Sequence, residues 1–300
     1  MKHILLTGAT GFLGSHLLEA LLTQGYKVTI LKRSTSDTWR IDHLLKNVSV
    51  HNDNESLELA FEGKAIDTVI HLATCYRKFE ETSDIEEMTK ANIAFPSEVL
   101  IQGIKHGLKH FINTGSYFEY DCSAQPVIES ATLKPFNYYA STKIAFDSIL
   151  KSYSKTLKAS TMRLFSPYGE KDNNKLIPML IKKALSGERL DLSEGFQKID
   201  PIYAGDIIDA YLKCLTSDDY TGYEAFNIGS GQAYSIRDIV SVIEEQLGKR
   251  LDITWGDRSL NDYECVYAGI DKARDILSWN PTHTLKKGIS KTIEYYRSDT

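Results

Sequence analysis

Short apolar segments alternate with longer amphipathic ones along the first half of the chain. Apolar runs of strand length predict strands, and apolar residues at helical spacing predict the helices between them. The predicted strands are residues 3–7, 28–31, 48–50, 68–72, 111–113 and 160–165, and the predicted helices are 12–22, 92–104 and 138–155. Strands that alternate with helices indicate a doubly wound parallel sheet with helices on both faces.

The pattern changes after Pro167. The elements predicted there are helices at 177–185, 206–215 and 235–247, the last with Ser235 as its N-cap, and short strands at 202–203 and 225–228. No low-complexity segment or linker separates the two halves. We therefore expect the second half to fold onto the first, with a cleft between them.

Three glycines follow the first strand and open the first helix, in the pattern G-x-x-G-x-x-G. They are Gly8, Gly11 and Gly14. Glycine lets a backbone approach a pyrophosphate, whose charge is favoured at a helix N-terminus. This context predicts a dinucleotide-binding loop; an ordinary tight turn is the alternative. The residues of the loop assigned to the cofactor are Gly8, Thr10, Gly11, Phe12, Leu13 and Gly14.

The end of the second strand indicates which dinucleotide binds. An acid is usual there when the ligand is NAD, because it binds the ribose 2′-hydroxyl. This chain has Lys32, Arg33 and Ser34 instead, which suit a 2′-phosphate. We expect NADP(H) rather than NAD(H), the alternative being a solvated basic turn. Asp53 follows the third strand and is either an adenine contact or an exposed turn acid.

Tyr139 and Lys143 lie one turn apart on a predicted helix, so their side chains share a face. A free tyrosine has a pKa of about 10, and lowering it by three units needs about 4 kcal/mol. A neighbouring ammonium can supply part of this. Ser116, just beyond the fifth strand, could donate a hydrogen bond to a substrate carbonyl beside Tyr139. Thr114 is the alternative for that role.

The chain resembles the extended short-chain dehydrogenases/reductases, the nucleotide-sugar epimerase, dehydratase and reductase family. The matching motifs are TGATGFLG at 7–14, HLA at 71–73, TGS at 114–116, YASTK at 139–143, RLFSPYG at 163–169 and FNIGSG at 226–231. The resemblance implies a Rossmann domain, residues 1–166 completed by segments near 200–230, and a smaller C-terminal α/β substrate domain, mainly residues 167–300. It implies Ser116, Tyr139 and Lys143 as the catalytic set.

The same resemblance extends the cofactor and substrate sites. It adds Leu72, Ala73, Thr74 and Thr114, together with Tyr139 and Lys143, to the cofactor site. Ser116, Tyr117, Ser166, Lys175 and Arg258 are expected to contact substrate, although family members often carry Asn where Ser166 stands. Asn92 and His71 are interpreted as structural, and Cys75 as a buried small residue. No metal is expected.

Departures from the family pattern narrow the expected reaction. Family 4,6-dehydratases carry an Asp-Glu pair where this chain has Tyr117-Phe118, so dehydration is not expected. Epimerase–reductases that make GDP-fucose have Cys at the position of Phe118. The pattern is similar to CDP-sugar 4-ketoreductases, which implies NADPH-dependent reduction of the C4 ketone of a nucleotide-linked 4-keto-6-deoxy sugar. An NAD-dependent nucleotide-sugar 4-epimerase and a non-catalytic NADP-binding sensor are the alternatives.

Composition limits the partners. The 35 basic and 40 acidic residues leave a net charge of −5, which gives no electrostatic indication of nucleic-acid binding. Apolar runs are too short to span a bilayer. Four cysteines without metal-ligand spacing are expected as reduced thiols in a cytoplasmic protein. By family analogy we expect a homodimer, formed through helices 92–104 and 138–155.

Overall fold

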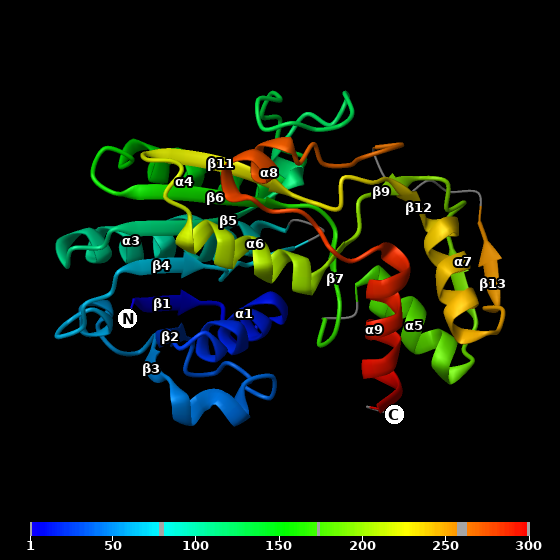
Figure 1. Ribbon diagram of the computed structural model, residues 1–300, viewed down its shortest axis with the longest axis horizontal. Coiled ribbons are helices and arrows are strands. Elements are labelled where there is room, and N and C mark those ends of the chain that lie inside the picture. The colour runs from blue at the N-terminus through cyan, green and yellow to red at the C-terminus, as the bar shows by residue number, and fades with distance from the viewer. Residues whose placement is uncertain (1, 78–80, 173–174, 257–262, 299–300) are drawn as a thin grey trace. The chain divides into compact units, whose positions relative to one another are not determined.

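The computed structural model describes residues 2–77, 81–172, 175–256 and 263–298 (Figure 1). Contacts divide the chain into two compact units. Unit 1 comprises Met1–Asp121, Ala131–Arg163 and Tyr211–Phe226, and unit 2 comprises Cys122–Ser130, Leu164–Ala210 and Asn227–Thr300. That unit 1 binds the cofactor and unit 2 the substrate stays a prediction.

A seven-stranded sheet forms the centre of unit 1. Its strands, in chain order, are β1 His3–Thr7, β2 Lys27–Lys32, β3 Ser49–Asn52, β4 Thr68–His71, β5 His110–Ser116, β6 Lys158–Leu164 and β11 Tyr223–Ile228. Their order across the sheet is β11-β6-β5-β4-β1-β2-β3, and β1 pairs in parallel with both β2 and β4. The strand order therefore reverses at β1, and ligands bind at the carboxyl ends of strands flanking such a point.

Apolar residues from both sheet and helices form the core of unit 1. Leu5, Val69 and Phe111 on the strands pack with Leu100 of α3 and Phe146 of α4, and all five are at most 1% exposed. The helices of the chain are α1 Phe12–Thr23, α2 Thr82–Thr89, α3 Phe95–Lys105, α4 Tyr138–Ser152, α5 Leu176–Ser186, α6 Ala204–Thr216, α7 Ile236–Leu247, α8 Asp271–Leu277 and α9 Leu285–Ser298. The predicted α/β fold with a doubly wound sheet is confirmed.

The helix predicted at residues 92–104 is longer than expected. α2 continues through a π-helical segment, η3 (Lys90–Ala94), into α3. Pro96 occupies the first turn of α3. Proline has no N–H and its ring crowds the carbonyl four residues earlier, so a local change of helical repeat is a physical way to accommodate it. α2 was not predicted, because its sequence, TSDIEEMT, has only two apolar positions, Ile85 and Met88.

Two element boundaries that matter for the site also differ. β5 runs to Ser116, three residues past its predicted end, so both Thr114 and Ser116 belong to the strand. α4 ends at Ser152 rather than at residue 155. Its start is fixed by Asn137, whose side chain accepts the Ala140 N–H at 2.9 Å.

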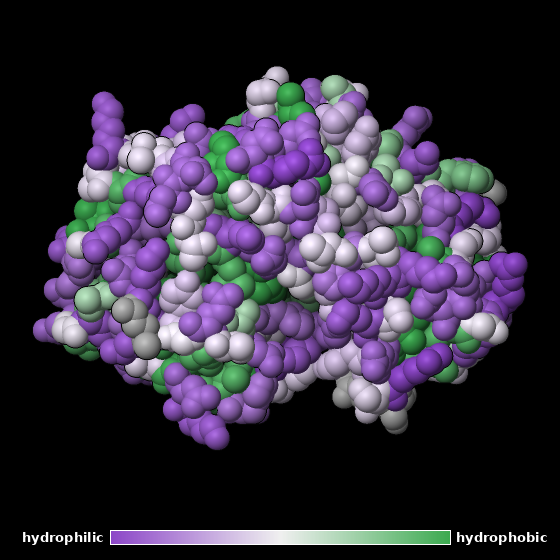
Figure 2. Space-filling view, in the orientation of Figure 1, coloured by the Kyte–Doolittle hydropathy of each residue, from purple (hydrophilic) through white to green (hydrophobic). Residues whose placement is uncertain are grey.

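Unit 2 has its own apolar core. Ile181 of α5, Ile239 and Ile243 of α7 and Ile289 of α9 are all fully buried in it. Short strands complete the unit: β7 Pro167–Tyr168, β8 Leu190–Leu192, β9 Lys198–Ile199, β10 Ile202–Tyr203, β12 Tyr234–Ser235 and β13 Ile253–Trp255. Hydrophilic residues predominate on the face of the molecule that Figure 2 shows. Among the described residues, no helix is long and apolar enough to cross a membrane.

Candidate active site

The glycine loop follows β1 and has a shape that a side chain would destroy. Gly8 has φ +74°, and a Cβ there would lie 2.6 Å from the Ala73 backbone nitrogen. A Cβ at Gly14 would lie 2.0 Å from the Gly8 carbonyl oxygen. The helix that follows, α1, has Gly11 at its N-cap and hence no capping side chain. The bare helix N-terminus and close backbone fit a dinucleotide pyrophosphate.

The flanking loop residues differ in what they can offer. Phe12 is buried and its ring lies edge-on to His16, with 5.6 Å between ring centroids. Its side chain therefore packs inside the protein. Because Phe12 is the first residue of α1, only its backbone is available to a ligand at the helix N-terminus. Thr10 and Leu13 are half-buried.

The basic end of β2 is exposed. Arg33 and Ser34 are exposed, and the Lys32 ammonium donates to the Arg33 carbonyl at 3.2 Å. Asp53 accepts the Ser34 N–H at 2.9 Å, a bond that lowers the pKa of the Asp53 carboxyl. Asp53 thus links the ends of β2 and β3 as a turn acid. A contact with adenine stays a prediction.

Arg40 is a cation near the glycine loop that the sequence analysis missed. Its Nη1 donates to the Thr10 carbonyl at 3.4 Å, and its guanidinium lies 4.3 Å from the centre of the Trp39 ring. Arg40 is thirty residues from Thr10 in the sequence, and no motif surrounds Arg40. The contact could therefore not be predicted from the sequence and is seen only in the folded structure.

Tyr139 and Lys143 meet the end of β5. The Lys143 ammonium donates to the Thr114 carbonyl at 3.1 Å and lies 5.7 Å from the centre of the Tyr139 ring. Lys143 is 3% exposed, and burial lowers its pKa to about 8. Burial also raises the pKa of Tyr139, while a hydrogen bond with Thr74 acts in the opposite direction. The phenol is therefore a proton donor at neutral pH unless another charge assists its ionisation.

The structure distinguishes the two candidate hydroxyls of β5. The Ser116 hydroxyl oxygen accepts the Phe118 N–H at 3.3 Å, which leaves its proton for another acceptor. The Thr114 hydroxyl donates to the His71 carbonyl at 2.8 Å and contacts the Tyr211 hydroxyl at 2.6 Å. Thr114 is thus used within the fold, whereas Ser116, at 9% exposed, can still donate to a ligand.

Asn92 and His71 support the site from behind. The Asn92 amide accepts from the Cys75 N–H at 2.8 Å and from the Thr74 hydroxyl at 3.1 Å, and donates to the Cys75 carbonyl and the Thr142 hydroxyl. Its amide therefore tethers the segment after β4 to helix α4. His71 contacts the Thr7 hydroxyl at 2.8 Å, and burial lowers its pKa well below the usual value, so it is neutral.

Two further side chains beside the site escaped the sequence analysis. The Tyr76 ring packs edge-on against Tyr139, with 5.0 Å between ring centroids, and is 43% exposed. Glu119 is fully buried and accepts the Ser116 N–H at 2.7 Å. A single aromatic in a loop gives no sequence indication of function, and a Glu three residues past a strand is usually solvent-exposed.

The predicted substrate residues are divided between the units. Tyr117 begins η4 (Tyr117–Glu119) in unit 1, and its ring lies 4.4 Å from that of Phe118. Ser166 accepts the Ile202 N–H through its carbonyl, and Lys175 is exposed at the N-cap of α5; both belong to unit 2. Arg258 lies outside the described residues. Cys75 is 8% exposed, as expected of a buried small residue.

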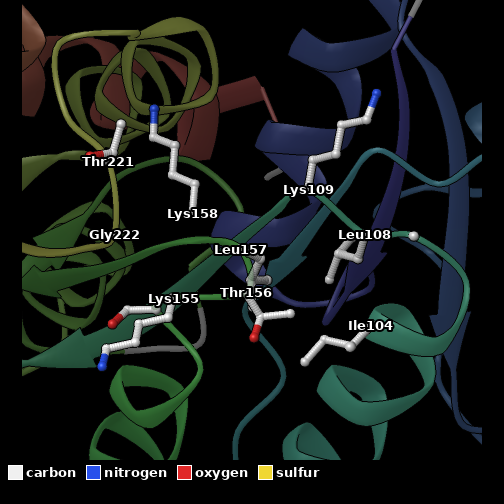
Figure 3. A pocket seen from close by; sticks show the side chains of 11 residues that line it. Ile104, Leu108, Lys109, Lys155, Thr156, Leu157, Lys158, Thr221 and Gly222 are labelled. Atoms are coloured by element: carbon white, nitrogen blue, oxygen red, sulfur yellow. The ribbon is translucent and has the colours of Figure 1, made fainter.

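A hollow of about 800 Å³ lies elsewhere on unit 1 (Figure 3). It is lined by residues at the ends of α3 and α4 and at the beginnings of β5 and β6, among them Lys109, Lys155 and Lys158. The three ammonium groups point in different directions in the figure. None of the predicted catalytic residues lines this hollow.

Comparison with known proteins gives a consistent result. Residues 4–229 match the model of the NAD dependent epimerase/dehydratase family. A CDP-abequose synthase from Salmonella muenchen is 28% identical, over 97% of each chain. A dTDP-4-dehydro-6-deoxyglucose reductase from Escherichia coli is 27% identical, over 98% of this chain and 97% of the other. The UDP-glucuronic acid 4-epimerase from Bacillus cereus, solved with UDP-glucuronic acid and NAD, superposes with a TM-score of 0.90 at 26% identity, covering 99% and 100% of the chains.

Proposed function

The chain belongs to the NAD dependent epimerase/dehydratase family and is an enzyme of it, and on this basis we propose that it reduces the C4 ketone of a nucleotide-linked 4-keto-6-deoxy sugar with NADPH. The observation that carries the proposal is the meeting of Tyr139, Lys143 and β5. Lys143 lies between the phenol and the strand that bears Ser116. Reduction of a ketone needs a hydride donor, a proton donor and a group that polarises the carbonyl, and these residues can supply the last two.

The roles follow from the hydrogen bonds. Ser116 donates its hydroxyl proton to the C4 oxygen, because its own oxygen already accepts from Phe118. Tyr139 holds the same oxygen and transfers its phenolic proton to it as negative charge develops. Burial raises the pKa of Tyr139. Lys143, whose ammonium lies 5.7 Å from the centre of the Tyr139 ring, is assigned the role of stabilising the phenolate that remains, because a nearby positive charge favours the ionised phenol. A bound nicotinamide cofactor supplies the hydride.

The residues around the glycine loop favour the binding of a dinucleotide, and the residues at the end of β2 favour NADPH over NADH. Lys32 and Arg33 put positive charge where a ribose 2′-phosphate would lie. The bidentate geometry of Arg33 suits a phosphate. Leu72, Ala73 and Thr74 follow β4, the neighbour of β1, and would border the cofactor on that side.

Two observations favour ketone reduction over other reactions of the family. Tyr117 and Phe118 stand where dehydratases carry carboxylates, so proton abstraction from the sugar ring lacks an acid–base pair there. Relatives that resemble this chain over nearly their full length include the CDP-abequose synthase and the dTDP-4-dehydro-6-deoxyglucose reductase. In addition, the aromatic rings of Tyr76 and Tyr117 offer apolar contact of the kind that a deoxygenated sugar carbon accepts.

A nucleotide-sugar 4-epimerase is the second candidate. It is favoured by the likeness to the UDP-glucuronic acid 4-epimerase solved with NAD. An epimerase would use the same three residues to oxidise and re-reduce C4, and would keep its cofactor bound. For either reaction Ser166, Lys175 and Arg258 are proposed to hold the nucleotide sugar.

The assay that tests the proposal follows NADPH absorbance with a panel of CDP-, dTDP-, GDP- and UDP-linked 4-keto-6-deoxy sugars. We expect stoichiometric oxidation with at least one of them. Flat absorbance with every sugar, despite tight NADPH binding, would favour a sensor. Release of bound NAD from the denatured protein, with interconversion of C4 epimers, would favour the epimerase.

The Tyr139→Phe variant tests the assigned proton donor. It removes one hydroxyl and leaves the ring against Tyr76, so we expect NADPH affinity to stay within about threefold while kcat falls by about 10²-fold or more. Tyr138→Phe, the neighbouring change on the same helix turn, is the matched control. Near-normal reduction by Tyr139→Phe would refute the role.

A further inference from the structure

A carboxylate lies buried directly behind Ser116. Glu119 is 0% exposed, and each of its oxygens accepts from an N–H group: one from the Ser116 backbone at 2.7 Å, the other from the Arg163 Nε at 2.8 Å. Burial raises the pKa of Glu119, and the Arg163 guanidinium and the Ser116 N–H oppose that effect. Since both hydrogen-bond partners can only donate, we assign the side chain as the anion. A buried charge is costly unless it is paired and hydrogen-bonded, and Glu119 is both.

Arg163 joins Glu119 to a second acid. Its Nη2 donates to Asp147 at 3.1 Å, and its Nη1 donates to the Tyr120 hydroxyl at 2.9 Å. Asp147 also accepts from the hydroxyl of Tyr223, at 2.6 Å and 2.7 Å to its two oxygens. With both acids ionised, one cation faces two anions, so a net negative charge sits inside unit 1 beneath the end of β5.

The backbone of β5 is shaped to receive this carboxylate. A Cβ at Gly115 would lie 2.7 Å from the Glu119 Oε1 and 2.9 Å from the Arg163 Cγ. The glycine before Ser116 therefore lets the ion pair contact the strand that presents the serine. This contact gives a physical reason for Gly115 in the TGS motif, whose other two residues carry the hydroxyl groups.

We propose that Glu119 is a positioning residue of the active site: it fixes the backbone of Ser116 through the Ser116 N–H, and it places a buried carboxylate beside the end of β5, where Lys143 is hydrogen-bonded. The inference rests on the proposed function, because it takes Ser116 as the group that polarises the ketone. Glu119 touches no reacting atom in this role and acts through its two neighbours.

Lys143 is surrounded by groups of different charge. Facing it are Glu119 from η4, the neutral His71 from β4, the Thr114 carbonyl from β5 and Tyr139 from its own helix, with Tyr211 of α6 behind Thr114. Burial lowers the pKa of Lys143, and the Glu119 carboxylate opposes that effect. Removing the carboxylate should therefore lower the pKa of Lys143 further.

The experiment compares Glu119→Gln with Asp147→Asn. Both variants remove one buried carboxylate from Arg163, and only the first touches Ser116. We expect both to unfold at lower urea concentration. We expect kcat for sugar-nucleotide turnover to fall about tenfold or more in Glu119→Gln and to stay within about threefold in Asp147→Asn, with the KM of the nucleotide sugar little changed in both. Equal losses of kcat would overturn the proposal and reduce Glu119 to a stabilising residue.

A second readout needs no substrate. The ionisation of Lys143 is followed through the Nζ resonance of 15N-lysine-labelled protein, assigned with Lys143→Arg. We expect its midpoint to move down by at least half a pH unit in Glu119→Gln and to stay in place in Asp147→Asn. An unmoved midpoint in Glu119→Gln would overturn the electrostatic part. Wild-type protein that reduces no sugar would refute the proposed function and leave this titration as the test of Glu119.

If Glu119→Gln does not fold, the double variant Glu119→Gln/Arg163→Met replaces it. The double change removes both charges of the pair, which a buried site tolerates better than the loss of one. Because the net charge near Lys143 is then unchanged, kcat is the readout: a folded double variant with kcat lowered about tenfold or more supports the proposal, and one with wild-type kcat overturns it.

Discussion

At the scale of single residues, the buried lysine of α4 is held at a cost to stability. Lys143 is 3% exposed, and burial lowers its pKa from 10.5 to about 8. A lysine whose folded-state pKa is depressed destabilises the fold fully below the folded value, and the cost disappears as pH rises to the unfolded value. The shift corresponds to about 3 kcal/mol, from which the hydrogen bond to Thr114 subtracts about 1 kcal/mol.

Lys143→Met should therefore stabilise the protein by about 2 kcal/mol at pH 7 while it abolishes turnover. The gain should shrink as pH rises from 8 toward 10.5, because the wild-type lysine then becomes neutral when folded. Urea denaturation at pH 7 and pH 10 measures this, with the exposed Lys105→Met as control. A gain that is equal at both pH values would contradict the burial argument.

Under the proposed function, the choice of NADPH over NADH depends on the exposed cation Arg33. Arg33→Asp places a negative charge where a 2′-phosphate would bind, so we expect NADPH affinity to fall at least tenfold and NADH affinity to change little or improve. Fluorescence titration with both cofactors measures the ratio. Lys46→Asp makes the same charge change at another exposed site of unit 1 and should alter neither affinity. Equal effects on both cofactors would show that Arg33 does not read the phosphate.

What the sequence could predict at this scale depends on chain separation. Tyr139 and Lys143 are four residues apart on one helix, so helical periodicity alone places them together. Glu119 pairs with Arg163 across 44 residues and Thr114 meets Tyr211 across 97. No periodic pattern connects such pairs, because Glu119 on η4 and Tyr211 on α6 are brought to their partners by tertiary packing.

At the scale of elements, a capping side chain allowed the start of a helix to be predicted correctly, whereas the ends of β5 and α4 were not predicted correctly. Ser235 was expected to cap the helix that follows, and its hydroxyl accepts the Asp238 N–H at 3.0 Å while Asp238 accepts the Ser235 N–H at 2.8 Å. By contrast, β5 extends to Ser116 and α4 stops at Ser152, because pairing and packing rather than residue type decide those ends.

Ser235→Ala should remove this capping box and destabilise the protein by about 1 kcal/mol. Ser241→Ala, an exposed serine on the same helix, is the control and should be neutral or slightly stabilising, because alanine has the higher helix propensity. The urea midpoint reports both changes. Equal destabilisation by the two variants would contradict the assignment of Ser235 as the cap.

At the scale of the whole molecule, the alternation of strand-length apolar runs with helical periods predicted the sheet of unit 1 correctly. Some of its strands have clear ends in the sequence: β1 lies between Lys2 and Gly8, and β11 between Gly222 and Gly229. The short strands of unit 2 were mostly missed. β8 and β9 are two or three residues long, and segments of that length carry too few positions to show a period. The helix α9 was also missed, although Leu285, Ile289 and Ile293 repeat at helical spacing and are buried.

The predicted homodimer concerns this scale as well. α3 and α4 contact each other within unit 1, and Ile101 of α3 and Ile144 of α4 remain half-buried. If these helices form the interface, Ile101→Lys should convert a dimer into a folded monomer, measured by light scattering after size exclusion. Leu59→Lys introduces the same charge at a site that is 50% exposed and should leave the dimer intact. A monomeric wild type would refute the predicted assembly.

The π-helical turn at Lys90–Ala94 behaves like an accommodated insertion. A helix that sheds one residue there would regain the ordinary repeat, and everything upstream would rotate by about 100°. Asn92, which is hydrogen-bonded both to Cys75 after β4 and to Thr142 of α4, would then point in another direction and lose these contacts. The length of this helix is consequently as constrained as the identity of its residues. We expect deletion of one residue here to abolish turnover, while circular dichroism still reports a folded protein.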